Sequence, residues 1–497
     1  MVPPCMRRSA LTAMIALAAC GDPAARVALV PLGGDCARPP QANAVEVIAY
    51  TASGERVKSV ALTESVAIAD FPADTEQIGV EVFVGGGAIG AAGKSAPLSY
   101  GALADGATIP VMMAPPGGFC ELAGMTEARA QPLVARAGDG ALVVGGMGPS
   151  GPLSTAEYYD PATAMFVPVE VPAVLAGDQG FTGATLATLP DGQVAVIGGP
   201  RAALVVFDPI RRAFVTAPTL IDAWLFAAAI AVGDQELLVA GGCSMVTGST
   251  CTPRLQTRRY QLNQLSASEL SAILTAGPRI SPQLFDLGIQ QDGKRRYLLA
   301  GGTGAADHAD RFALDGNEPA EAVPGGHAQA AALDGGAVLT AFGGGASAVD
   351  PSDTAAVSAP DAAAFQPIAT APPQSDTRLI ALEDGRVAGF GLGVDAMGNA
   401  IGQVLTYDPT RDAWTAAMHT AQTGLLSQPS LARLGDGTIL VVGGAVSQRA
   451  WVYRPSLVGP ASGSVTATPA SDVSAGVLTA PDPATVARTA NPPAWQL

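Results

Sequence analysis

The chain has 497 residues, of which 48% are hydrophobic, 14% are charged and 59 are glycine. It is too long for one ordinary core and too apolar for intrinsic disorder, so several domains or a repeat architecture are expected. Lys and Arg number 27 against 43 Asp and Glu, which gives a formal net charge of −16. Because phosphate backbones repel such a chain, nucleic acid is not expected as a partner.

The N-terminal segment MVPPCMRRSALTAMIALAAC differs from the rest of the chain. Arg7 and Arg8 precede an apolar run at residues 10–19, and Cys20 follows it. About ten apolar residues are too few to span a bilayer, which takes about twenty, so residues 1–19 are predicted to be an export signal. The ending LAAC resembles the cleavage box of bacterial lipoproteins, which implies that Cys20 carries a diacylglycerol. A plain secretory signal, cut after another alanine, is the alternative.

The lipoprotein resemblance implies membrane attachment through lipid at Cys20. In the enteric sorting rule, an Asp directly after that cysteine keeps a lipoprotein in the inner membrane, and here the place holds Gly21. The expected location is therefore the outer membrane, facing the periplasm or the cell surface. Residues 20–35 are interpreted as a tether.

The cysteine usage agrees with export. Beyond Cys20 the chain has Cys36, Cys120, Cys243 and Cys251. Four cysteines in an oxidising compartment predict two disulfides, and closeness along the chain favours Cys243 with Cys251, which leaves Cys36 with Cys120. A zinc site is the alternative, although no pair has the Cys-x-x-Cys spacing and the chain has 3 histidines.

Residues 36–120 alternate apolar and polar residues in short runs broken by turn signals, as in AVEVIAYTASGERVKSVAL from Ala44. Short alternating runs without a helical period predict a small antiparallel β-sandwich. The segment resembles Ig-like or transthyretin-like modules. It is interpreted as a stalk between the lipid and the region that follows.

One phrase recurs seven times between residues 127 and 468: an Asp, usually followed by Gly, then a mostly apolar run, then a pair of glycines. The copies begin at Asp139, Asp191, Asp234, Asp292, Asp334, Asp384 and Asp436. They repeat about every 50 residues, which is the period of one four-stranded propeller blade. Asp-Gly suits a hairpin turn, the apolar run suits a strand covered on both faces, and glycine lets backbones approach closely. The signature glycines are Gly145, Gly146, Gly198, Gly199, Gly241, Gly242, Gly301, Gly302, Gly343, Gly344, Gly443 and Gly444.

A second phrase, an aromatic residue followed by Asp-Pro, occurs at Tyr159, Phe207 and Tyr407, with another aromatic residue five positions after the proline. Asp-Pro favours a turn, and the spaced aromatic residue is expected on the fourth strand, against a neighbouring blade. The two phrases resemble the kelch repeat. The resemblance implies an all-β chain with a seven-bladed β-propeller over residues 127–468, preceded by the small sandwich. An irregular set of stacked β-sandwiches is the alternative.

Some copies depart from the kelch pattern. Those from Asp234 and Asp292 lack Asp-Pro, and the sixth copy has Gly391-Leu392-Gly393 in place of the glycine pair. The last copy has Pro460 where an aromatic residue is expected, and SGSVTATP at 462–469 is a candidate for its fourth strand. Residues 469–497, rich in Ala, Ser, Thr and Pro, are interpreted as a C-terminal tail.

Kelch propellers include enzymes, which makes the catalytic residues of those enzymes relevant to this chain. Galactose oxidase, which resembles this fold, needs copper held by two His and two Tyr, whereas His308, His327 and His419 fall in three different repeats. The periplasmic kelch epimerase that acts on N-acetylneuraminate offers no short motif to transfer. No catalytic residue, metal site or cofactor is therefore predicted.

The leading interpretation is a non-catalytic, lipid-anchored envelope protein whose propeller loops bind a protein or a glycan. The longest candidate loops are 147–156 and 243–258. A sugar-acting kelch enzyme, epimerase-like or galactose-oxidase-like, is the alternative function. Four loop carboxylates are interpreted as solvated charges, with a calcium or sugar contact as the alternative: Asp307, Asp310, Asp350 and Asp353.

Overall fold

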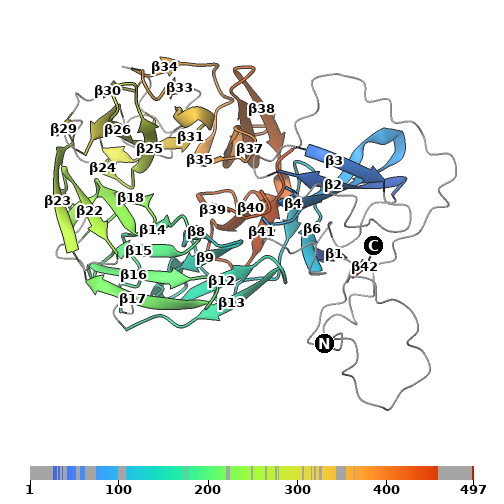
Figure 1. The fold of residues 1–497 in the computed structure, drawn as a ribbon, viewed down its shortest axis with the longest axis horizontal. Helices are drawn as coiled ribbons and strands as arrows, with labels where there is room; N and C mark the ends of the chain where they lie inside the picture. The colour runs from blue at the N-terminus through green and yellow to red at the C-terminus, as the bar shows by residue number, and fades with distance from the viewer. Residues whose placement is uncertain are drawn as a thin grey trace, which may run out of the picture. The chain divides into compact units, whose positions relative to one another are not determined.

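A computed structural model of the chain is all-β, and its described part contains strands and short 3-10 turns (Figure 1). The chain divides into two compact units, a smaller one of residues 1–31, 38–113 and 464–497 and a larger one of residues 32–37 and 114–463. The described residues are 26–30, 32–33, 36, 42–51, 56–61, 74–98, 108–173, 175, 177–219, 224–247, 250–262, 266–274, 277, 279–304, 307–314, 316–317, 321–323, 327–342, 354–362, 364–456 and 495–496.

The smaller unit contains two sheets that share a core. The first has the order β3-β2-β4-β5 and is antiparallel. The second has the order β42-β1-β6, with β1 parallel to β6 and antiparallel to β42. The strands are β1 (Arg26–Val30), β2 (Ala44–Tyr50), β3 (Arg56–Ala61), β4 (Gln77–Phe83), β5 (Ile89–Lys94), β6 (Thr108–Met112) and β42 (Trp495–Gln496). The shared core contains Val47, Ile78, Val80, Ile109 and Val111.

This unit differs from the sequence-based expectation at both ends. Strand β1 lies in the segment interpreted as a tether, and β42 lies in the segment interpreted as a tail. The pairing of β1 with β6 is parallel, whereas an antiparallel sandwich was expected. Such a sheet needs partners far apart in the chain, which short alternating runs do not identify.

In its described residues, the larger unit contains six antiparallel sheets of four strands and one of five, besides three two-stranded sheets. We number the seven larger sheets one to seven by their first strands: β8 (Leu133–Ala137), β14 (Ala184–Thr188), β18 (Ala228–Gly233), β25 (Gln283–Ile289), β31 (Gln329–Ala332), β35 (Ser375–Ala381) and β39 (Pro429–Arg433). The second strands are β9 (Gly140–Val144), β15 (Val194–Gly198), β19 (Glu236–Ala240), β26 (Arg295–Ala300), β32 (Val338–Ala341), β36 (Val387–Val394) and β40 (Ile439–Gly443).

The outer strands of the seven sheets follow in the same order. The third strands are β12 (Ala156–Asp160), β16 (Ala203–Asp208), β22 (Gln256–Gln261), β28 (His308–Ala313), β33 (Ala355–Ser358), β37 (Ala400–Asp408) and β41 (Ala450–Tyr453). The fourth strands are β13 (Met165–Val169), β17 (Ala213–Thr219), β23 (Ser266–Ile273), β29 (Gly316–Asn317) with β30 (Glu321–Ala322), β34 (Gln366–Pro367), β38 (Ala413–Met418) and β7 (Phe119–Glu121).

The last sheet takes its fourth strand from the other side of the repeat region. Strand β7 pairs with β41, with Val452 opposite Cys120 and Tyr453 opposite Phe119. The range 127–468 expected from the repeats begins after this strand. The candidate fourth strand at 462–469 lies outside the described residues.

Neighbouring sheets contact each other through their first strands, and β39 of sheet seven contacts β8 of sheet one (Figure 1). Because each sheet is antiparallel, strands one and two join at the same end as strands three and four; we call this the turn end. Strands two and three join at the opposite end, where the chain also enters the next first strand; we call this the entry end.

Backbone hydrogen bonds join neighbouring sheets at both ends. At the turn end, the Gly138 N–H donates to the Gly192 carbonyl at 2.8 Å, and the Gly435 N–H donates to the Asp139 carbonyl at 3.0 Å. At the entry end, the second glycine of a pair donates to the next sheet, as from Gly199 to the Trp224 carbonyl at 2.9 Å. Consecutive sheets therefore present the same end to the same side.

The recurring Asp residues have a local role at the turn end. The Asp191 carboxylate accepts the Gln193 N–H at 3.0 Å, and Asp436 accepts the Thr438 N–H at 3.0 Å. In an Asp-Pro turn, Asp208 accepts the Ile210 N–H at 2.9 Å. Such side-chain bonds to the backbone two residues on stabilise tight turns, so the repeated Asp specifies the fold.

Candidate functional site

The glycine pairs permit close backbone packing at the entry end. All ten described members of these pairs have positive φ, from 61° to 89°. A Cβ on Gly146 would lie 2.6 Å from the Ala130 carbonyl oxygen, and one on Gly302 would lie 2.6 Å from the Ile280 carbonyl oxygen. A side chain there would require backbone to move. Gly343 and Gly344 lie outside the described residues.

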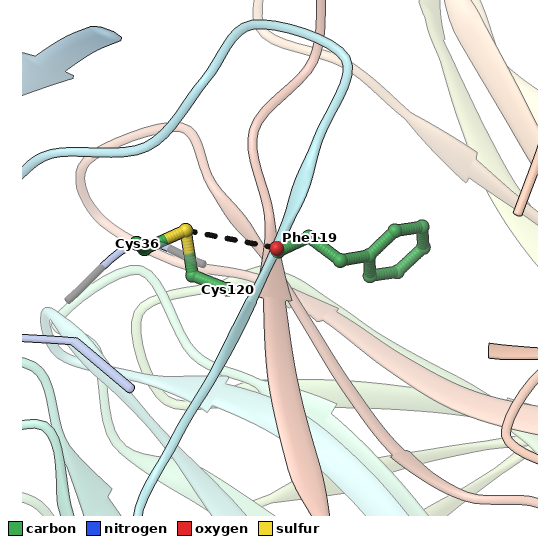
Figure 2. The surroundings of a disulfide bond; sticks show 3 residues. All are labelled: Cys36, Phe119 and Cys120. Atoms are coloured by element: carbon green, nitrogen blue, oxygen red, sulfur yellow. Dashed lines mark hydrogen bonds between the residues drawn. A yellow bond between two sulfur atoms is a disulfide. The ribbon is translucent and has the colours of Figure 1, made fainter. Parts of the chain in front are cut away.

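Both expected disulfides are present, each with a Cα–Cα distance of 5.5 Å. The Cys36–Cys120 bond holds the segment around residue 36 against β7, where the Gly33 N–H also donates to the Glu121 carbonyl at 2.8 Å. In Figure 2, the Cys36 sulfur lies 3.6 Å from the Phe119 carbonyl oxygen. The disulfide therefore fastens the strand that completes sheet seven.

The Phe119 ring points away from the disulfide (Figure 2). Its centroid lies 4.8 Å from that of His419 and 4.9 Å from that of Tyr453. This contact links β7 to sheets six and seven, because His419 follows β38. Apolar packing and the disulfide thus act on opposite sides of the same short strand.

The Cys243–Cys251 bond closes a hairpin at the entry end of sheet three. Its strands are β20 (Cys243–Thr247) and β21 (Thr250–Pro253), which pair antiparallel. Met245 and Val246 are exposed on this hairpin. The disulfide therefore fixes a loop that presents apolar side chains.

The three histidines lie in three separate settings. His327 is buried, and its two ring nitrogens lie 3.0 and 2.9 Å from the hydroxyl oxygens of Thr340 and Thr354. Burial lowers the pKa of His327 to about 4. His308 lies 3.1 Å from Asp307 on the surface, and burial lowers the pKa of His419.

Within the described residues, no group of three or more His, Cys, Asp or Glu side chains is arranged to hold a metal ion. Asp310 is buried in β28 rather than solvated in a loop. Asp350, Asp353, the signal at 1–19 and the lipidation residue Cys20 lie outside the described residues.

Two buried arginines at the entry end were missed from the sequence. Arg129 donates to the Gly145 carbonyl at 2.7 Å and to Glu157 Oε1 at 2.7 Å. Arg279 stands in the same place in sheet four, where it bonds the Gly301 carbonyl at 3.3 Å and lies 3.7 Å from Asp310. The shared signal is Arg-x-x-Pro immediately before the first strand. Each guanidinium therefore binds the carbonyl of the first glycine in the glycine pair of its own sheet.

The acidic partners of the two arginines differ in length by one methylene group, because one is a glutamate and the other an aspartate. Glu157 reaches the Arg129 guanidinium, whereas the shorter Asp310 leaves a longer gap to Arg279. Burial lowers the pKa of Arg279, and the nearby Asp310 opposes this shift. Sheet one therefore carries the better compensated buried charge.

Left-handed backbone recurs where the chain enters the first strands. Five non-glycine residues there have φ between 46° and 56°: Gln131, Phe226, Ser281, Asp376 and Gln428. Each such residue costs about 1–3 kcal/mol and persists only when its surroundings hold it. At the turn end, Ala164, Arg212 and Asp412 are also left-handed, each in an Asp-Pro turn, so left-handed backbone recurs at both ends of the sheets.

Side-chain hydrogen bonds connect three of these positions across sheets six, seven and one. Gln131 donates to the Gln428 side-chain oxygen, and Gln428 donates to Asp376 Oδ1 at 3.1 Å. The Ser427 hydroxyl donates to Asp376 Oδ2 at 2.9 Å. We call Gln131, Gln428, Ser427 and Asp376 the entry network. It fixes the relative position of three first strands.

Exposed apolar side chains also gather at the entry end. In the described part of the chain 12 large hydrophobic side chains are exposed, and most of them lie in connections between second and third strands or at the end of a fourth strand. Those at the entry end are Met147, Met245, Val246, Leu255, Val394, Met397, Met418 and Val446. Those elsewhere are Met165, Ile210, Val215 and Ile289. Their concentration at this end makes it the candidate contact surface.

No protein-family model matches the chain, and no curated protein matches it. In the described part of the chain, no helix is long and apolar enough to cross a membrane.

Proposed function

We propose that the larger unit is a kelch-type, seven-bladed β-propeller that binds a protein or a glycan at its entry end without catalysing a reaction. The observation that carries the binding proposal is the gathering of exposed apolar side chains at this end. Rigid repeats that hold variable connections are a common basis for recognition.

Contacts between sheets one and seven support the propeller. Strand β39 contacts β8, and the Ser430 hydroxyl donates to the Pro132 carbonyl at 2.6 Å. Strand β7 precedes sheet one in the chain yet completes sheet seven, so the two ends of the repeat region share a sheet. Such sharing joins the beginning and the end of the repeat region through one sheet, as expected for a propeller.

The smaller unit is proposed to be an Ig-like or transthyretin-like module. Its two sheets pack through Val47, Val80 and Val111, which supports a sandwich. We further propose that the protein is anchored in the outer membrane by lipid on Cys20. The support is the order of Arg7 and Arg8, the apolar run and LAAC.

The anchor is tested by intact-mass measurement of membrane and soluble fractions. The mature protein is expected to begin at an acylated Cys20, and Cys20→Ala is expected to remain uncleaved or become soluble. A wild-type protein that is soluble, unacylated and begins elsewhere would contradict the anchor.

The binding function is tested on the detergent-solubilised full chain. A glycan array and crosslinked envelope fractions serve as probes, and sugar turnover is followed by NMR. Retention of a glycan or of a discrete protein is expected. Turnover of a sugar with neither retained would support the enzymatic alternative and overturn the binding function.

A further inference from the structure

Strands β36 and β37 are longer than the second and third strands of the other six sheets. They form a hairpin that pairs from Val387 with Tyr407 to Val394 with Ala400. Strand β36 has 8 residues and β37 has 9, whereas β40 and β41 of sheet seven have 5 and 4. Both β36 and β40 begin three residues after their turn-end Asp, so the added length lies at the entry end. Three more residues extend a strand by about 10 Å.

The tip of this hairpin is held in one conformation. Asp395 Oδ1 accepts the N–H groups of Met397 at 2.9 Å and Asn399 at 2.8 Å, and Oδ2 accepts the Asn399 side-chain amide at 3.1 Å. Gly398 supplies the positive φ of 83° that the turn requires. The Asn399 bonds lower the pKa of Asp395, which keeps the carboxylate ionised as an acceptor.

This ordered tip presents apolar rather than polar side chains to solvent. Met397 is 84% exposed and Val394 is 61% exposed. Met418 is also exposed and pairs with Gln403 on the neighbouring strand β37. An apolar anchor that is already ordered loses little conformational entropy when it binds, so it favours association.

Exposed apolar side chains also occur at the entry end of sheets seven and one. Val446 lies between β40 and β41 of sheet seven, and Met147 lies between β9 and β12 of sheet one. We call the following residues the methionine patch: Val394, Met397, Met418, Val446 and Met147. The entry network joins the same three sheets at the same end.

The chemistry of the patch selects one kind of partner. Between Val387 and Thr406 the only charged residue is Asp395, and its carboxylate is used within the turn. An anionic bilayer needs flanking cations, which this hairpin lacks in a chain of net charge −16. Sugars are usually bound by polar groups and aromatic faces, whereas the patch consists of thioether and valine side chains. Flexible thioethers are typical of surfaces that bind apolar regions of other proteins.

We propose that the methionine patch is the docking surface for an apolar region of a partner protein, with Met397 as its central anchor. The inference rests on the binding function proposed above and chooses protein over glycan. The entry network holds sheets six, seven and one in the arrangement that the partner contacts.

Site-specific photocrosslinking in the native cell tests the surface. The photoreactive residue p-benzoylphenylalanine replaces Met397 or Val446 in the full acylated chain, and replaces Ile210 as the control. Ile210 is an apolar residue at the turn end and is 92% exposed. The same protein adduct is expected from positions 397 and 446 and not from 210.

Two further variants measure the anchor once the adduct has been purified. Met397→Gln should weaken binding of that partner at least about tenfold, as expected for one interface anchor. Asp395→Ala keeps Met397 but loosens the tip, and it should weaken binding by about threefold to tenfold. Met397 is exposed and Asp395 lies in a surface turn, so both variants are expected to fold, which circular dichroism checks.

Three outcomes would overturn the proposal: lipid adducts at 397, equal protein adducts at 397 and 210, or unchanged affinity in Met397→Gln. A glycan retained on the array together with any of these outcomes would leave the binding function standing. If no glycan is retained and no specific protein adduct forms, the binding function is overturned as well.

Discussion

The turn end and the entry end of the larger unit are built from the same repeats but follow different rules. At the turn end the same side chain returns in sheet after sheet, as Asp191 and Asp436 show by closing their own turns. At the entry end the glycine pairs also recur, but the residues around them change between sheets: buried arginines occur in sheets one and four, and exposed apolar side chains in sheets one, three, six and seven. Repetition therefore specifies the fold, whereas variation identifies the surface available for recognition.

The largest expected difference between the two ends comes from replacing one glycine by alanine at each end. Gly198 and Gly293 share a φ of 81°. A Cβ on Gly198 would stand against the backbone carbonyl oxygen of Trp224, whereas a Cβ on Gly293 has no atom within 4 Å. We expect Gly198→Ala to lower the free energy of unfolding by about 4 kcal/mol and Gly293→Ala by about 1 kcal/mol.

Equilibrium unfolding in guanidinium chloride measures both glycine variants. Equal losses would mean that positive φ alone sets the cost, and that the entry end is not more tightly packed than the turn end.

The next largest effect is expected from charge burial. Arg129 is fully buried and pairs with Glu157 at 2.7 Å, whereas Arg211 is 74% exposed and lies 3.5 Å from Asp208 at the turn end. Arg129→Met leaves a buried carboxylate without its cation and should cost about 3–4 kcal/mol. Arg211→Met should change stability by less than about 0.5 kcal/mol.

Thermal unfolding followed by circular dichroism compares the two arginine variants. The double variant Arg129→Met/Glu157→Gln should recover part of the loss. A loss that persists in full would show that the arginine acts through its backbone bonds rather than through the ion pair.

Features of the turn end are encoded by short sequence phrases, whereas many features of the entry end are not, and this difference determines what the sequence could predict. Asp-Gly turns, Asp-Pro turns and apolar second strands are local, so the all-β fold and the antiparallel repeats were readable from short phrases. Both disulfides were also correctly paired, because Cys243 and Cys251 lie close along the chain and one pairing of Cys36 and Cys120 then remained.

The remaining features depend on contacts that no local phrase encodes. Strand β7 has 3 residues and pairs with β41 from far along the chain, so its role in sheet seven was missed. Arg129 and Arg279 are charged residues in a segment that reads as a loop, and burial of such residues is rare. The exposure of Met397 likewise depends on where the hairpin ends relative to its neighbours.

A buried histidine at the entry end should make stability depend on pH. The pKa of His327 is about 4 in the fold, against about 6.5 in the unfolded chain. The unfolded state therefore binds more protons between these values, so this contribution is complete above about pH 6.5 and is lost as the pH falls toward 4. The change should approach about 3 kcal/mol.

Unfolding measured at pH 7 and pH 4.5 tests the His327 contribution. His327→Gln should remove this part of the pH dependence, whereas His308→Gln, on the surface, should retain it. An identical pH dependence in wild type and His327→Gln would show that carboxylates alone cause the acid instability.

The smallest effect is expected from the Cys243–Cys251 bond, because it restrains a hairpin outside the sheet cores. Its partners are 8 residues apart in the chain, and closing so short a loop stabilises a fold by about 2 kcal/mol in the chain-entropy model. Cys243→Ser/Cys251→Ser should raise hydrogen exchange in β20 and β21 while β19 and β22 stay protected, since backbone bonds within sheet three do not need the disulfide.

Hydrogen exchange read by mass spectrometry measures the protection of these strands, and peptide mapping of the wild type without reductant checks the disulfide. Loss of protection throughout sheet three would show that a hairpin at the entry end supports the fold. The fold would then not be specified by the turn end alone.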